Sequence, residues 1–196
     1  DFVITYFGAY FALTVVANDA ARSYGQANPV FTGTLSGMQN GDNIAAAYAT
    51  TAATNSPIGT YAIVPSLTDP DGKLTNYTVY ATNGTLTITA AALTVVADDI
   101  SRSYGQPNPE FTGTLGGVQN GDHITATYST SATTNSPAGA HAIVPNLVDP
   151  DSKLTNYTVF ATNGTLTVTK VTLTVTADNK SKVYGEANPP LAASYA

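Results

Sequence analysis

The chain has 196 residues, only 10% of them charged, and a formal net charge of −6. Lys and Arg total 7 against 13 acidic residues, which leaves no basic surface to collect phosphates and excludes nucleic-acid binding as a main function. No Cys is present, so disulfides and thiol chemistry are excluded. The most apolar stretch, residues 3–17, is shorter than the roughly 20 residues of a spanning helix, and we expect no membrane insertion in this segment.

A gapless repeat of 80 residues dominates the sequence. Leu13, Leu93 and Leu173 each begin nearly the same stretch, and 56 of the 80 aligned positions are identical between the first two copies. A fixed period without insertions predicts a tandem array of small domains. We expect the final strand of a preceding repeat at 1–11, complete repeats at 12–91 and 92–171, and the start of a third, incomplete repeat at 172–196.

Within one repeat, short strands alternate with turn signals. In chain order, strands are predicted at 13–17, 31–35, 44–51, 60–67, 76–81 and 85–89. Pro65 indicates an edge or a bulge in the fourth strand, and one helical turn is expected after Asp42. Asn83-Gly84, repeated as Asn163-Gly164, predicts a type I′ hairpin between the last two strands.

This pattern predicts an all-β fold of tandem Ig-like β-sandwich domains, with about six short strands in each. A β-grasp-like domain is the alternative. The junctions at 90–92 and 169–172 contain no Gly, Ser or Pro linker, which favours a stiff rod. The predicted core comprises Leu13, Val15, Phe31, Leu35, Ile44, Tyr48, Ile63, Leu67, Tyr77, Val79, Leu86 and Ile88, with their partners 80 residues later.

Features that the domain needs should appear in both copies, and the two histidines do not. His123 aligns with Asn43 and His141 aligns with Tyr61. No Ser–His–Asp set or His-based metal site therefore repeats, and the sequence contains no nucleotide-binding fingerprint. We expect no catalytic residue, no enzyme activity and no cofactor.

Four aspartates and four asparagines are weaker candidates for sites. The pairs Asp69/Asp71 and Asp149/Asp151 suit turns, although their oxygens are also the kind that calcium binds. The Asn-x-Thr triplets match the N-glycosylation acceptor pattern. They begin at Asn76, Asn83, Asn156 and Asn163.

A Tyr-Gly motif occurs three times, at Tyr24-Gly25, Tyr104-Gly105 and Tyr184-Gly185. It lacks the clustered glycines of a phosphate-binding loop. We expect the Tyr ring to pack near the domain junction. We expect the Gly to adopt a backbone conformation closed to other residues.

The motif string LTVxAxxxxxxYGxxNP, NGD, GxxAI, NYTV and NGTLT resembles the MBG domain of the YGX type. The resemblance covers both complete repeats and the start of the third. It implies a mostly β, extracellular bacterial protein, at the cell surface or secreted, in which tandem arrays form stalks or adhesins. It carries over no catalytic residue.

These observations predict a structural, non-catalytic repeat of an extracellular fibre or adhesin stalk, with further copies of the repeat as partners. The alternative is a carbohydrate- or mucin-binding module that acts through multivalency on surface glycans. Residues 1–11 and 172–196 cannot bury their apolar side chains alone. Each should dock on further repeats of the chain or, by strand exchange, on a neighbouring subunit. The aromatic residues of the first segment are Phe2, Tyr6, Phe7, Tyr10 and Phe11.

Overall fold

The computed structural model describes residues 10–196, and the fold is all-β, as predicted. The first repeat contains β1 (Phe11–Ala17), β2 (Ala20–Ser23), β3 (Gly33–Ser36), β4 (Ala45–Ala49), β5 (Gly59–Thr68), β6 (Tyr77–Thr82) and β7 (Gly84–Thr89). The second contains β8 (Ala91–Ala97), β9 (Ile100–Ser103), β10 (Gly113–Gly116), β11 (Thr125–Ser129), β12 (Gly139–Val148), β13 (Tyr157–Thr162) and β14 (Gly164–Thr169). Short 3₁₀ turns, η1 (Lys73–Asn76) and η2 (Leu154–Asn156), precede β6 and β13.

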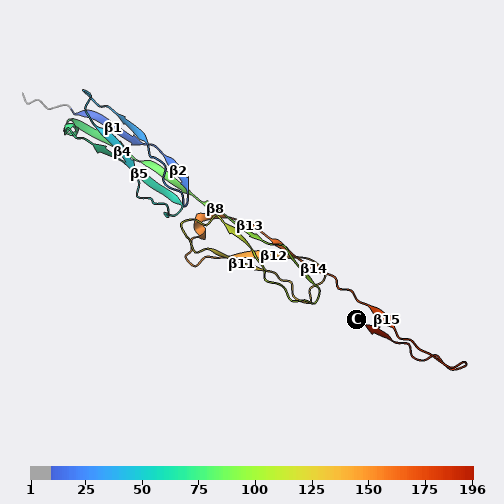
Figure 1. Ribbon diagram of the computed structural model, residues 1–196. Helices are drawn as coiled ribbons and strands as arrows, with labels where there is room; N and C mark the ends of the chain where they lie inside the picture. The colour runs from blue at the N-terminus through green and yellow to red at the C-terminus, as the bar shows by residue number, and fades with distance from the viewer. Residues whose placement is uncertain (1–9) are drawn as a thin grey trace, which may run out of the picture. The chain divides into compact units, whose positions relative to one another are not determined.

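The strands of each complete repeat form two sheets. In the first repeat the strand orders are β3-β1-β6 and β2-β7-β5-β4, and in the second they are β10-β8-β13 and β11-β12-β14-β9. In the first repeat β1 contacts β5 and β3 contacts β4, so its two sheets pack against each other (Figure 1). Within these mixed sheets, β1 pairs in parallel with β6 and β2 with β7.

The chain changes sheets twice at one place in the first repeat. It passes from β1 to β2 through Asn18 and Asp19, and from β6 to β7 at Asn83. The two crossings touch, because the Thr85 N–H donates a hydrogen bond to Asp19 Oδ1 at 2.7 Å. A Cβ added to Gly84 would lie 2.5 Å from the carbonyl oxygen of Asn18. This position therefore requires glycine for close backbone approach.

The hairpin predicted at Asn83-Gly84, and at Asn163-Gly164, is wrong. In both repeats the two strands flanking the pair belong to different sheets and do not hydrogen-bond to each other. None of these four residues has a positive φ, whereas a type I′ turn requires it at both central positions. The Asn-Gly pair marks a sheet crossing in this fold.

Two further expectations need correction. The helical turn expected after Asp42, which belonged to the β-grasp alternative, does not form. β4 begins at Ala45, which leaves too few residues after Asp42 for a helical turn, and no α-helix occurs in residues 10–196. Residues 20–23, for which no strand was predicted, form β2, which pairs in parallel with β7.

Pro65 lies where β5 pairs with only one neighbour. Tyr48 on β4 faces Pro65, and β5 pairs with β7 over residues 59–63 only. The missing N–H of the proline therefore removes no bond to β7. β5 has a neighbour on each side along its length, but at Pro65 it pairs with β4 alone. Pro65 therefore lies at a local edge of the sheet, as predicted.

The predicted core is largely the observed one. Seven of the twelve named residues of the first repeat are buried: Leu13, Val15, Ile44, Ile63, Tyr77, Leu86 and Ile88. Four more are half-buried and pack against them: Phe31, Leu35, Tyr48 and Leu67. Val79 and its partner Val159 are wrong, because they lie on the exposed face of β6 and β13.

The chain divides into two compact units. The first comprises the described residues up to 95 with Leu115–Ala126 and Leu147–Ala161, and the second comprises Val96–Thr114, Thr127–Asn146 and Thr162–Ala196. The first unit thus holds the first repeat and part of the second. The last two strands of the second unit, β15 (Val175–Ala177) and β16 (Ala193–Tyr195), pair with each other.

The apolar side chains at the two ends of the sequence were predicted to need a partner. In the C-terminal segment, Leu173, Val175, Leu191 and Tyr195 are exposed. In the N-terminal segment, Tyr10 and Phe11 are also exposed, while Phe2, Tyr6 and Phe7 lie outside the described residues. No helix within residues 10–196 combines the length and the apolar character needed to cross a membrane.

Candidate functional site at the Tyr-Gly loop

A buried arginine holds the loop that carries the first Tyr-Gly motif. Arg22, on β2, is only 8% exposed and donates from Nε to Asn28 Oδ1 at 2.7 Å and from Nη2 to the Ala53 carbonyl oxygen. Asn28 in turn donates to the Ala52 carbonyl oxygen at 2.7 Å. These hydrogen bonds satisfy a cation that would otherwise be costly to bury. They tie Arg22 and Asn28 to each other and to the backbone at Ala52 and Ala53.

Gly25 turns the chain within this loop. Its φ is 82°, in the left-handed region that glycine adopts without steric cost. The next residue closes the turn, because the Gln26 N–H donates to the Ser23 carbonyl oxygen at 3.2 Å. Tyr24 therefore lies in a turn that backbone and Arg22 hydrogen bonds hold in place.

Tyr24 projects from the first repeat onto residues of the second, within the first compact unit. Its ring packs edge-on against Tyr157, with 5.5 Å between ring centroids and 76° between the planes. Its hydroxyl donates to Asp122 Oδ2 at 3.1 Å. Only 1% of the Tyr24 side chain remains exposed. We call Asp122 and Tyr157 the Asp–Tyr site.

The Asp–Tyr site is built by its own repeat. The Tyr157 hydroxyl donates to Asp122 Oδ2 at 2.7 Å and accepts the Gln119 N–H at 2.8 Å. Asp122 therefore accepts hydrogen bonds from two phenols, one from each repeat. Burial and the hydrogen bond to Asp122 raise the pKa of Tyr157 to about 12. The site thus favours the neutral phenol.

Two hydrogen bonds and one close backbone approach between the repeats lie around Tyr24. The Ile58 N–H donates to Asn156 Oδ1 at 3.1 Å, and Asn120 Nδ2 donates to the Thr54 carbonyl oxygen at 3.4 Å. A Cβ added to Gly25 would lie 2.5 Å from the Gln119 Cβ. Glycine is therefore required at this position both by its φ and by the approach of the next repeat.

Apolar packing continues through this contact. A single buried cluster contains Ala17, Tyr24, Ala52, Ile63, Leu86 and Ile88 of the first repeat and Ala91, Leu93, Ile124 and Tyr157 of the second. All of these residues belong to the first compact unit. The core of the first repeat is thus continuous with these four buried residues of the second repeat.

The other two Tyr-Gly motifs share the backbone but not the burial. Gly105 and Gly185 have φ values of 82° and 87°. Tyr104 is 44% exposed, and Tyr184 is fully exposed. Burial of the motif tyrosine therefore depends on the Asp–Tyr site that covers it and not on its own loop.

The paired aspartates hold turns. Asp69 Oδ2 accepts the Leu74 N–H and Asp149 Oδ2 accepts the Leu154 N–H, each at 2.7 Å. These backbone donors lower the pKa of both carboxyl groups. Asp151 instead pairs with His123 at 2.7 Å.

Metal-ligating side chains do not gather in the described part of the chain. Among residues 10–196, no group of three or more His, Cys, Asp or Glu residues could hold a metal ion. Asp71 and Asp151 are exposed beside the turn residues Asp69 and Asp149. The calcium alternative gains no ligand set from this arrangement.

The four candidate glycosylation sites differ in access. Asn76, Asn83 and Asn163 are exposed, whereas Asn156 is only 4% exposed and accepts the Ile58 N–H. The same position thus has different roles in the two repeats, because Asn156 lies at the contact that Tyr24 makes.

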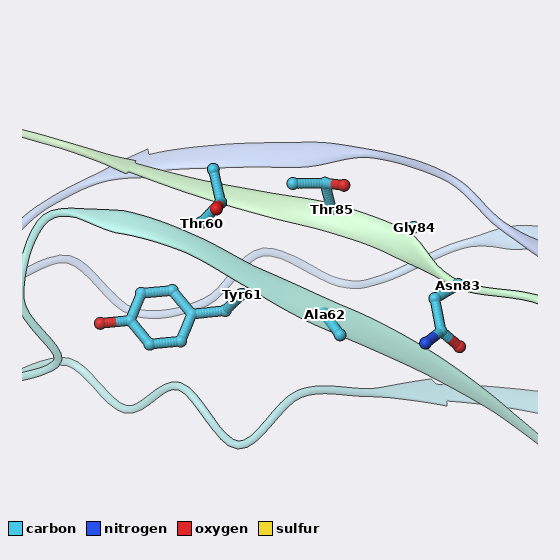
Figure 2. Close-up of a pocket in the computed structure, with 6 residues that line it drawn as sticks. All are labelled: Thr60, Tyr61, Ala62, Asn83, Gly84 and Thr85. Carbon is cyan, nitrogen blue, oxygen red and sulfur yellow. The ribbon is translucent and has the colours of Figure 1, made fainter.

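A shallow depression of about 230 Å³ lies between β5 and β7 (Figure 2). Its lining comprises Thr60, Tyr61, Ala62, Asn83, Gly84 and Thr85. The Tyr61 ring points along the strand away from Asn83 in Figure 2, and its hydroxyl donates to the Pro57 carbonyl oxygen at 2.9 Å. His141 replaces Tyr61 in the second repeat. His141 Nε2 lies 2.9 Å from the Pro137 carbonyl oxygen, so the contact to this carbonyl repeats while the tyrosine ring does not.

The sequence analysis singled out the Tyr-Gly motif but missed its partners. Asp recurs at 42 and 122 and Tyr at 77 and 157, yet nothing in the sequence links the two positions. Internal repetition is the signal that finds them, because both positions are identical in the two copies. Their meeting across 35 residues follows only from the fold.

A model of the MBG domain (YGX type) family matches residues 13–87, 93–167 and 173–196. A search of curated proteins finds no match to the chain. The three matched stretches begin at the three repeated leucines, and each contains one Tyr-Gly motif.

Proposed function

The chain belongs to the MBG domain (YGX type) family, and we propose that it is a structural, non-catalytic segment of an extracellular bacterial fibre or adhesin stalk. One observation carries the proposal. Tyr24 of the first repeat is buried against Asp122 and Tyr157 of the second. A repeat that covers its neighbour in this way uses its surface for assembly into an array.

The junction chemistry supports a stiff connection. β7 ends at Thr89 and β8 begins at Ala91, which leaves one residue between the strands. A flexible connector would use several Gly or Ser residues. The short connection and the docked loop together restrict rotation, so we expect repeats to be joined head to tail in a filament.

We further propose that each complete repeat is an Ig-like β-sandwich. The two packed sheets of the first repeat and the strands that cross between them support this assignment. Sandwich domains with short strands suit a stalk, because their ends lie far apart and carry the connections. The first repeat begins with β1 and ends with β7, and the second begins with β8 and ends with β14.

Electron microscopy of the native material on the source cells tests the stalk. We expect filaments that extend from the cell surface. Isolated particles without filaments would contradict the proposal. The location outside the cell is part of the same test.

Denaturing mass analysis of isolated fibres then separates two ways to build them. A continuous chain of many repeats predicts species far larger than the 20.1 kDa of these 196 residues. Strand exchange between separate subunits predicts discrete small species. We favour the continuous chain, because the first two repeats already connect without a linker.

Binding of surface glycans is the second candidate, and one observation favours it. Tyr80 and Phe160 occupy the same position on β6 and β13 and are 57% and 55% exposed. An exposed aromatic ring at each repeat suits stacking on sugar faces and multivalent attachment. A glycan array probed with the chain tests this candidate. Binding that Tyr80→Ala and Phe160→Ala abolish would support it, and an absence of binding would exclude it for the glycans on the array.

A further inference from the structure

The loop at Tyr104 has the same local hydrogen bonds as the loop at Tyr24, but no Asp–Tyr site covers it among residues 10–196. Arg102 donates to Asn108 Oδ1 at 2.7 Å, as Arg22 does to Asn28. Gly105 has the same φ of 82° as Gly25. The local support of the two tyrosines is therefore the same.

The two loops differ in sequence at Ala27/Pro107 and Val30/Glu110, and they differ most in their surroundings. A Cβ at Gly25 would collide with Gln119, whereas a Cβ at Gly105 would meet nothing within 4 Å. Tyr24 is 1% exposed and Tyr104 is 44% exposed. The Tyr104 loop is thus held in a docking geometry without the surface that it would dock on.

The missing surface has a defined chemistry. Tyr24 uses a carboxylate that accepts its hydroxyl and an aromatic edge that meets its ring. Asp42 and Tyr77 form the same pair in the first repeat, with the Tyr77 hydroxyl 2.7 Å from Asp42 Oδ2. Every complete repeat of this sequence therefore carries an Asp–Tyr site.

We propose that the Tyr104 loop docks on the Asp–Tyr site of another complete copy of this repeat. This inference rests on the proposed function, since it names the contact that would join successive repeats of the stalk. The third matched stretch, residues 173–196, aligns with residues 93–116 and does not include an Asp–Tyr pair. A completed third copy supplies one at the correct spacing along the chain.

The partner is a repeat and not an unrelated protein because two requirements must coincide. The partner must present a carboxylate that already accepts a hydrogen bond from a neighbouring tyrosine hydroxyl. It must also place a Gln side chain against the glycine of the loop, where a Cβ would collide. Gln39 and Gln119 occupy that position in both complete copies. The loop and the site are thus complementary parts of one repeating unit.

The test extends the chain after Ala196 with a copy of residues 117–172, which completes the third repeat. Nitration of tyrosine rings, followed by peptide mapping, measures how accessible each tyrosine ring is to solvent. In the original chain Tyr24 should be protected, and Tyr104 and Tyr184 should react. In the extended chain the reactivity of Tyr104 should fall by about tenfold or more, to the level of Tyr24.

Tyr184 is the internal control, because no repeat follows the third, and it should remain reactive. An extension that carries D122A in the appended copy should restore the reactivity of Tyr104. A second extension, made from residues 37–92, supplies the same site in the other natural sequence. If Tyr104 stays as reactive as Tyr184 in both extended chains, the inference is overturned.

This result is independent of the micrographs. Filaments in which Tyr104 remains reactive would support the stalk function and contradict the docking of the Tyr104 loop. A protected Tyr104 without filaments would support the docking and contradict the stalk function.

Discussion

Tyr24 and Tyr104 are the same residue of the same loop in two different surroundings, which makes them a matched pair. Tyr24→Ala removes a buried ring and leaves Asp122 with one donor fewer, so it should lower the free energy of unfolding by about 3–5 kcal/mol. Tyr104→Ala removes a half-exposed ring and should cost about 1 kcal/mol or less. Chemical denaturation of both variants measures the difference. Equal losses would show that the loop itself, and not the docking, determines the stability.

The raised pKa of Tyr157 predicts sensitivity to alkali. Its folded value of about 12 lies above the ordinary value of 10.0, so the neutral phenol is the stabilised form. The stabilisation is complete below pH 10 and is lost as the pH rises toward 12. Tyr157→Phe should therefore destabilise the chain most below pH 10, and its deficit should shrink as the pH rises toward 12.

Denaturation of the wild type and Tyr157→Phe across this pH range measures that deficit. Tyr80→Phe is the control for removal of a hydroxyl group at an exposed position. Phenolate absorbance gives the titration directly. A Tyr157 that ionises together with the exposed tyrosines would contradict the account.

At the residue scale, the sequence predicts Gly25 well and Asp122 poorly. A glycine that recurs after tyrosine in three copies needs a special conformation, and its φ is positive in all three. The role of Asp122 depends on a contact with Tyr24, 98 residues away, and only the fold sets that distance. The repeat comparison selects such positions but does not pair them.

At the scale of elements, the two sheet crossings at Asn18-Asp19 and Asn83-Gly84 support each other, and they make a sharp prediction. Gly84→Ala adds a Cβ that collides with the Asn18 carbonyl oxygen, and it should cost about 1–3 kcal/mol through forced backbone shifts. Asn83→Ala should cost about 0.5 kcal/mol or less, because Asn83 is exposed and has an ordinary φ. A type I′ hairpin would make both substitutions costly. Thermal unfolding of the two variants separates these cases.

Strands were easier to predict than their partners. Alternating β-branched residues locate β1, β5 and β7 closely, because burial on one face imposes a period of two. The four residues of β2 include the charged Arg22 on the buried side, and this hides the strand from a search for apolar alternation. The pairing at Asn-Gly was misassigned because a local turn signal cannot distinguish a hairpin from a sheet crossing.

For the molecule as a whole, we propose that the contact of Tyr24 with Asp122 and Tyr157 holds these parts of the second repeat against the first. A continuous buried cluster joins the two repeats within the first compact unit. If successive repeats make the same contact, as we propose, the array has a direction, because each loop would dock on the site of the next copy. Repetition in the sequence predicts the array, and the structure adds the contact of Tyr24 with Asp122 and Tyr157.

Small-angle X-ray scattering of the 196-residue chain and of Tyr24→Ala, compared at equal concentration, tests this claim most directly. The account predicts that one fixed arrangement of the first two repeats fits the wild-type curve. It also predicts that Tyr24→Ala, with its strands intact by circular dichroism, requires an ensemble of arrangements. Tyr104→Ala should leave the arrangement of these two repeats unchanged. Identical curves for the wild type and Tyr24→Ala, or a wild type that already behaves as freely jointed, would contradict it.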